Sequence, residues 1–148
     1  MSDLVDKMKV VLADTFAFYL KAHYFHWNVE GPDFPEYHKF FGDIYEEVFD
    51  AVDVIAEKIR TLDSYAPGSF KRFEQLSTIE TIETVPDAKG MIAILAEDND
   101  SVIDTIVAAM AAVNKPKHKG IENFLQERLD AHQKHAWMLR ATRKNNGE

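Results

Sequence analysis

The chain has 148 residues, of which 46% are hydrophobic and 28% charged, and its formal net charge is −8. These values are ordinary for one globular domain with a substantial core, and they exclude an intrinsically disordered chain. Cysteine is absent, which excludes disulfides, thiolate nucleophiles and cysteine-based zinc or iron–sulfur sites. His, Asp and Glu remain as metal ligands, a set that favours iron, zinc or manganese.

No secretory signal or membrane span is expected. The first residues include acids and lack the apolar run of a signal peptide. The longest apolar run, 106–113, is far short of the ~20 residues that cross a bilayer. The sequence therefore predicts a cytoplasmic protein with no membrane partner.

Apolar residues recur at helical spacing along nearly the whole chain. A first long helix is expected from Asp3 to about Val29. Gly31 and two prolines then mark a turn, and a second long helix is expected from Phe34 to Leu62. Such a turn predicts an antiparallel hairpin.

A long connection follows the second helix and is expected to carry a short helix from Phe70 to Leu76. Asp87 is a plausible N-cap for a third long helix, which Pro116 would close. A fourth long helix is predicted from about Gly120 to Arg143. Four long helices without a strand signal predict an all-α four-helix bundle, formed as a single domain by residues 1–148.

Four residues form a candidate metal site that differs from the usual one. Dinuclear sites inside four-helix bundles use Glu-x-x-His pairs, and no Glu stands three residues before a His in this chain. The chain offers instead His26 before the turn, His38 after it, and Asp53 with Glu57 one helical turn apart.

These ligands cannot all come from one copy of the chain. His38 and Asp53 are fifteen residues apart in one predicted helix, a separation of roughly 22 Å. If two copies of the helix packed antiparallel about a two-fold axis near Glu46 and Glu47, His38 of one copy would lie beside Asp53 and Glu57 of the other. The two identical sites would suit Fe(II) and leave coordination positions for water or an oxidant.

Each element also has a simpler interpretation. A carboxylate pair at i, i+4 on a helix is usually a solvated face, and Lys58 and Arg60 stand close by. A lone His26 beside Trp27 would more often be a packed or hydrogen-bonded structural residue. The four residues together favour a metal site.

Two sequence motifs resemble a known family. Residues 26–31 read His-Trp-Asn-Val-Glu-Gly and are followed by His38, which closely resembles the signature of the Dps family of mini-ferritins, also called DNA-binding proteins from starved cells. Residues 52–62, Val-Asp-Val-Ile-Ala-Glu-Lys-Ile-Arg-Thr-Leu, resemble its second signature, with Lys58 where Arg is more usual. Tyr37 replaces a smaller aliphatic residue before the first signature's last His. The likeness extends over essentially the whole chain.

The resemblance implies a ferritin-like fold that assembles into a hollow dodecamer with ferroxidase sites at the dimer interfaces. His26 and His38 would come from one subunit, and Asp53 and Glu57 from its partner. Fe(II) would be oxidised, preferentially by hydrogen peroxide and otherwise by O2, and Fe(III) would be stored as mineral inside the shell, which protects against oxidative damage. Trp27 would be either an electron donor to the site or a packed interface aromatic.

Further positions leave alternatives open. His132 stands where many relatives have an aliphatic residue, and we expect a buried, hydrogen-bonded histidine or an additional ligand that would raise affinity for zinc, a competing ion. The acidic residues Glu46, Glu47 and Asp50 are either a mineral nucleation site or a solvated face. Glu122 stands near the usual place of a pore-lining aspartate, so the iron entry route stays open.

DNA binding is expected to be weak or absent. Duplex affinity depends on Lys and Arg, and the chain has no basic N-terminal tail. Twelve copies at −8 each would give a shell a charge of −96. The alternatives to an iron-storing ferroxidase are a structural or DNA-compacting shell with a vestigial site, and a small bundle that holds haem or zinc between histidines.

Overall fold

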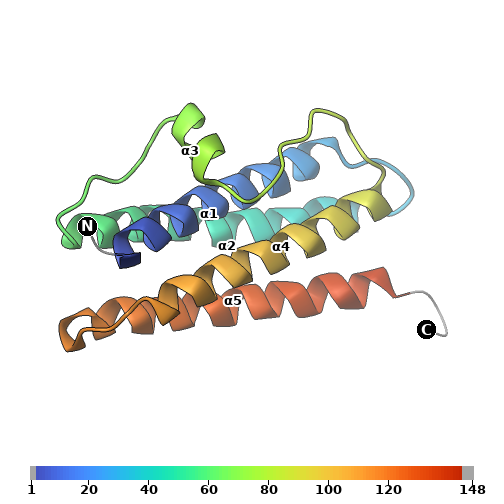
Figure 1. Ribbon diagram of the computed structural model, residues 1–148. Helices are drawn as coiled ribbons and strands as arrows, with labels where there is room; N and C mark the ends of the chain where they lie inside the picture. Colours follow the sequence, from blue (N-terminus) through green and yellow to red (C-terminus); the bar gives the residue numbers. More distant parts are fainter. Residues whose placement is uncertain (1–2, 145–148) are drawn as a thin grey trace.

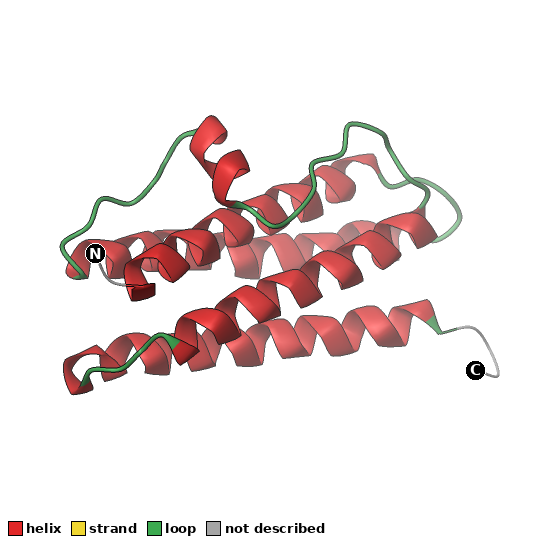
Figure 2. Cartoon of the chain, in the orientation of Figure 1, coloured by secondary structure: helices red, strands yellow, loops and turns green. Residues whose placement is uncertain are grey.

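The computed structural model describes residues 3–144 and confirms the all-α prediction (Figure 1). The helices are α1 Asp3–Asn28, α2 Phe34–Thr61, α3 Phe70–Leu76, α4 Ala88–Ala111 and α5 Lys119–Arg143, and a 3-10 turn, η1, covers Pro116–His118. Within 3–144 there is no strand, as Figure 2 shows. The predicted bounds agree to within about two residues except at the end of α4, which stops several residues before Pro116.

The four long helices form one bundle around a single core. α1 packs on α2 and on α4, and α4 packs on α5, whereas α2 and α5 touch more sparingly. The large, fully buried side chains come from every long helix: Met8, Leu12, Phe18, Phe25, Phe41, Ile44, Ile55, Ile59, Met91, Ile92, Leu95, Ile106, Leu125 and Leu139. Asp87 caps α4 as expected, because its side chain accepts a hydrogen bond of 2.8 Å from the Gly90 amide.

The turn between α1 and α2 places the end of one helix beside the start of the other. Gly31 has a φ of +119°, a conformation that a residue with a Cβ adopts only with strain. Its carbonyl accepts a hydrogen bond of 3.0 Å from the Phe34 amide, and Pro35 follows in the first turn of α2. The chain therefore reverses within five residues, between Asn28 and Phe34.

The connection from α2 to α4 runs along the bundle and carries α3, as Figure 1 shows. Buried Asp14 on α1 accepts hydrogen bonds of 2.7 Å from Ser77 and Thr78 in the connection and from Thr105 on α4. Lys21, also buried, donates to the Glu80 carbonyl at 2.6 Å and to an α4 carboxylate. These bonds fix a segment that the sequence alone suggested only as a long connection. Among residues 3–144, no helix is long and apolar enough to cross a membrane.

Candidate metal centre

The structure brings His26 and His38 together, as the sequence predicted. His26 lies in the last turn of α1 and His38 in the first turns of α2, and their rings stack with centroids 3.8 Å apart. His26 Nδ1 lies 2.6 Å from the His38 carbonyl oxygen, and His38 Nδ1 lies 2.7 Å from the His26 carbonyl oxygen. The two residues thus hold each other through reciprocal side-chain to backbone hydrogen bonds.

These bonds determine which nitrogen of each ring is free. A carbonyl oxygen only accepts, so Nδ1 carries the proton in both His26 and His38. In the neutral ring, Nε2 then holds the lone pair that binds a metal. A hydrogen bond from the other ring nitrogen to a carbonyl is the usual way in which proteins orient a ligating histidine. The pair therefore presents two oriented nitrogen donors.

Gly42 on α2 makes room for this arrangement, a role that the sequence motifs did not predict. A Cβ at position 42 would lie 3.2 Å from both Cε1 and Nδ1 of His26. That distance is closer than most contacts allow, so a side chain here would require the His26 ring to shift by a few tenths of an ångström. The sequence does contain one indication of this role, because Gly42 lies in the middle of a predicted helix, four residues after His38 and on the same face.

Aromatic side chains pack around the histidine pair. His23, one turn before His26, stacks on Tyr45 with ring centroids 3.8 Å apart and lies 4.1 Å from the Trp27 ring. The Tyr19 hydroxyl lies 3.0 Å from His23 Nδ1. Burial, and then the nearby His26, lower the pKa of His23, which therefore stays neutral at pH 7. Trp27 remains 58% exposed.

Asp53 and Glu57 lie together on the exposed face of α2, far along the helix from His38. A hydrogen bond that the protonated Glu57 carboxyl donates to Asp53, followed by the negative charge of Asp53, raises the pKa of Glu57. Two neighbouring carboxylates also attract a cation placed between them. Because α2 is one unbroken helix, the separation of roughly 22 Å from His38 to Asp53 stands.

His132 lies in the bundle interior with its ring fully buried. Its Nδ1 lies 2.7 Å from Asn99 Oδ1, and its Nε2 lies 3.2 Å from Arg128 Nη2. Burial, then the charge of Arg128, lower the pKa of His132 well below the usual value. Both ring nitrogens have partners, which supports the buried, hydrogen-bonded alternative over an additional ligand for the His26 site.

Glu47 departs from the expectation of an acidic cluster on α2. Its carboxylate accepts hydrogen bonds from both terminal nitrogens of Arg128, and His135 Nε2 lies 2.8 Å from its Oε1. Burial works to raise the pKa of Glu47, but hydrogen bonds from His135 and Arg128 outweigh it and hold the pKa well below its usual range. Only Glu46 and Asp50 of the predicted cluster are exposed.

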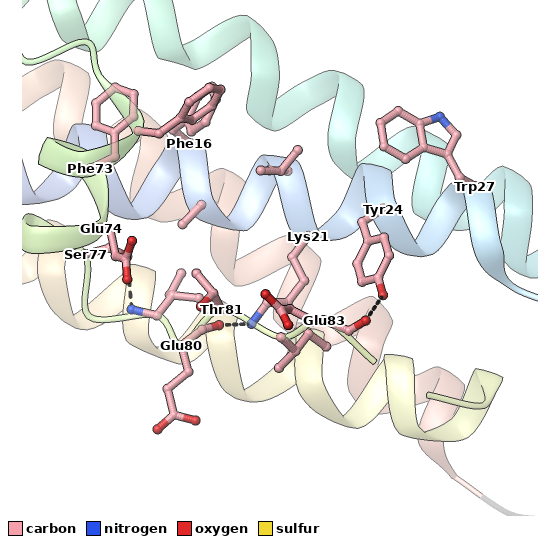
Figure 3. Close-up of a pocket in the computed structure, with 15 residues that line it drawn as sticks. Phe16, Lys21, Tyr24, Trp27, Phe73, Glu74, Ser77, Glu80, Thr81 and Glu83 are labelled. Carbon is pink, nitrogen blue, oxygen red and sulfur yellow. Dashed lines mark hydrogen bonds between the residues drawn. The ribbon is translucent and has the colours of Figure 1, made fainter. Parts of the chain in front are cut away.

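A groove of about 450 Å³ lies between α1 and the connection that carries α3 (Figure 3). Phe16, Tyr24 and Trp27 line it from α1, and Phe73 lines it from α3. Trp27 and Phe73 lie at opposite ends of the groove in Figure 3. Its lining is largely apolar. Trp27 connects this surface to the histidine pair.

Within residues 3–144, no three carboxylate or imidazole side chains of one chain are placed around a common metal position. The histidine pair and the carboxylate pair supply two side chains each, and the length of α2 keeps the two pairs apart within one chain.

Comparison with known proteins agrees with this fold. The family profile described as a ferritin-like domain matches residues 5–145. An uncharacterized low temperature-induced protein of Nostoc sp. is 35% identical over 132 residues, which cover 88% of this chain and 74% of that protein. DNA protection during starvation protein 2 of Bacillus anthracis is 27% identical over 138 residues, 93% of this chain and 94% of that one.

Among solved structures, Dps from Staphylococcus aureus superposes with a TM-score of 0.90 at 24% identity, covering 97% of this chain and 96% of the other. The matched segments in each case span nearly the whole bundle. The chain belongs to the Dps family of ferritin-like proteins.

Proposed function

We propose that this protein is a mini-ferritin that oxidises and stores iron. Fe(II) binds where His26 and His38 of one subunit meet Asp53 and Glu57 of another, hydrogen peroxide oxidises it, and Fe(III) mineral accumulates inside a dodecameric shell. The observation that carries the proposal is the reciprocally bonded pair of histidines, which leaves two Nε2 lone pairs free at the protein surface.

The surface of α2 supports pairing with a second copy. Phe49 is 50% exposed and Val54 is 38% exposed, although both are apolar. Phe49 precedes Asp53 by four residues and therefore shares its face of the helix. An antiparallel partner helix would cover these side chains and, at the same time, bring the carboxylates of one chain to the histidines of the other. The groove beside Trp27 would extend the contact.

The chemistry follows from the ligand set. Two nitrogen and two carboxylate donors bind Fe(II) without filling its coordination sphere, so an oxidant can approach. Two Fe(II) ions give two electrons to hydrogen peroxide, and with two protons the products are two Fe(III) and two water molecules. Delivery of both electrons together avoids release of hydroxyl radical, which protects the cell from oxidative damage. O2 would serve as a slower oxidant, and zinc would compete for the same ligands.

DNA binding is not part of the proposed activity. The relative from Bacillus anthracis has DNA protection in its name, but this chain carries a net charge of −8. Duplex affinity depends on basic residues that neutralise phosphates, so we expect at most weak binding at physiological salt. A gel shift at that salt with saturable, tight binding would contradict this and favour a DNA-compacting shell.

The sharpest test is complementation between two inactive variants. One variant carries His26→Ala with His38→Ala, and the other carries Asp53→Ala with Glu57→Ala. Each alone should lose rapid peroxide-dependent oxidation of Fe(II). When the two are co-expressed in equal amounts, half of the dimers are mixed, and each mixed dimer has one intact site. Activity should then return to about a quarter of wild type.

The result distinguishes a site shared between two subunits from a site within one chain. No recovery in mixed particles would contradict a site shared between subunits, because a site within one chain cannot be rebuilt by mixing. A matched control, Glu46→Ala with Asp50→Ala, removes the same charges at the same spacing from the exposed face of α2. It should retain the initial oxidation rate. Light scattering on every sample would check that the particle contains twelve subunits.

A further inference from the structure

A second cluster of metal-binding side chain types lies inside the bundle, away from the proposed iron site. It joins Glu47 on α2 with Arg128, His132 and His135 on α5 and Asn99 on α4. Arg128 and His135 are buried, and His132 has no exposed surface. α2 and α5 touch sparingly, and this polar cluster bridges the space between them. Nothing in the proposed iron chemistry uses it.

The hydrogen bonds fix the direction of the His132 lone pair. The Asn99 side-chain nitrogen donates to the His132 backbone carbonyl at 2.8 Å, so the Asn99 amide oxygen is the atom that faces the ring. That oxygen accepts from His132 Nδ1 at 2.7 Å. Nε2 is therefore the unprotonated nitrogen, and its lone pair is directed at Arg128 Nη2, 3.2 Å away.

The same guanidinium nitrogen also faces a carboxylate. Arg128 Nη2 lies 3.1 Å from Glu47 Oε1, while Nη1 donates to Oε2. A carboxylate oxygen and an imidazole lone pair thus converge on one cationic nitrogen from α2 and α5. This is the pair of donors that a divalent metal ion between the helices would receive.

We propose that the Arg128 guanidinium occupies a metal position between Glu47 and His132, and so keeps divalent cations out of the bundle interior. Arg128 Nε supports this assignment, because it is buried and has no hydrogen-bond partner. A buried donor left unpaired is costly, so the guanidinium is not held here by an ideal hydrogen-bond set. The Arg128 side chain then determines where iron binds: with this position filled, iron binds only at the interface between subunits.

His135 would complete the metal site once the guanidinium is removed. It now donates from Nε2 to Glu47, 2.8 Å away. A shift of its proton to Nδ1 turns Nε2 into a third donor beside Glu47 and His132. Two imidazoles, one carboxylate and a water molecule make a common tetrahedral zinc site. Within residues 3–144 of the wild-type chain, these side chains are not placed around a common metal position, so the site forms only if they shift once the guanidinium is removed.

Anomalous diffraction from crystals of the assembled protein soaked in Zn²⁺ tests the proposal directly. Arg128→Ala should show a zinc peak between Glu47 and His132, and wild type soaked identically should show none there. Arg128→Ala with His132→Gln is the matched control and should lose the peak. In solution, Zn²⁺ should raise the Tm of Arg128→Ala by about 5 °C or more, without a comparable rise in the control.

Two results would overturn the proposal: a zinc peak at this position in wild type, or no peak there in the Arg128 variants. Should Arg128→Ala fail to assemble, Arg128→Ser places a hydroxyl that can hydrate Glu47, and the same peak is expected. The wild-type measurement stands in either case. Because diffraction locates each metal, failure of the interface iron site would appear separately from failure of this one.

Discussion

Two histidine clusters in this molecule differ in which ring nitrogens have a hydrogen-bond partner. At the end of the bundle, His26 and His38 each donate a hydrogen bond from Nδ1 to the other's backbone carbonyl oxygen, which leaves Nε2 free. In the interior, His132 has a partner at both ring nitrogens. A histidine's capacity to bind metal therefore depends on which ring lone pairs its neighbours leave without a hydrogen bond, and a count of His residues does not reveal it.

The carboxylates Glu57 and Glu47 also differ in how their neighbours shift the pKa. The pKa of Glu57 is raised because Asp53 is its hydrogen-bonding neighbour, whereas the pKa of Glu47 is held well below its usual range, against its burial, by hydrogen bonds from His135 and Arg128. At Glu57 the neighbour is a second acid, whereas at Glu47 the chain itself supplies the cationic partner.

The largest expected effect on stability comes from the interior. Glu47→Gln removes the charge that balances buried Arg128, and breaking such a pair usually costs several kcal/mol. Because the Glu47 side chain is 38% exposed, solvent screening reduces the expected loss of unfolding free energy to about 1–3 kcal/mol. Urea unfolding measures it. Initial Fe(II) oxidation should stay within about twofold of wild type, and a parallel loss of activity would break the contrast between the two clusters.

Acid titration sharpens the same prediction. The folded pKa of Glu47 is depressed, so its contribution to stability is complete above the unfolded value of about 4.3 and is lost as the pH falls below it. The difference in unfolding free energy between wild type and Glu47→Gln should therefore shrink as the pH is lowered from about 5 to about 3. A difference that is constant over this range would show that the Glu47 charge is not responsible.

The next effect concerns the geometry of the open histidine pair. Gly42→Ala places a Cβ 3.2 Å from the His26 ring, and loss of the hydrogen bond that orients a ligand typically lowers metal affinity about 10- to 100-fold. Fe(II) affinity, measured by anaerobic calorimetry, should fall accordingly. Alanine also favours a helix over glycine by about 1 kcal/mol, which offsets the strain of the close contact with His26, so the free energy of unfolding should change little. Gly120→Ala, where a Cβ meets open space, should leave affinity unchanged.

Sequence patterns predicted the fold well because it depends on strong local signals. Helical periodicity, the Gly31 turn and the Asp87 cap each act over a few residues, and each proved correct. The length of one helix was also enough to predict that His38 and Asp53 cannot meet within a chain. The closeness of His26 and His38 followed from their places on either side of a tight turn.

The sequence could not predict contacts between residues far apart in the chain. Glu47 looked like part of an acidic face because its neighbours on α2 are acidic, and its partners Arg128 and His135 are more than eighty residues away. Asp14 gave no signal of its contact with the α3–α4 connection for the same reason. Such pairs depend on how the helices pack, which local patterns do not specify.

The smallest effect is expected at Trp27, where the open cluster meets the groove. Its ring lies 4.1 Å from His23 and is 58% exposed, so Trp27→Phe preserves an aromatic contact and should change the rate of Fe(II) oxidation less than about twofold. The two roles considered for Trp27 separate in a second measurement, spin trapping during peroxide addition. An electron donor predicts more trapped hydroxyl radical in the variant, whereas a packed aromatic predicts equal amounts. Equal amounts together with weaker assembly would assign Trp27 to the subunit interface.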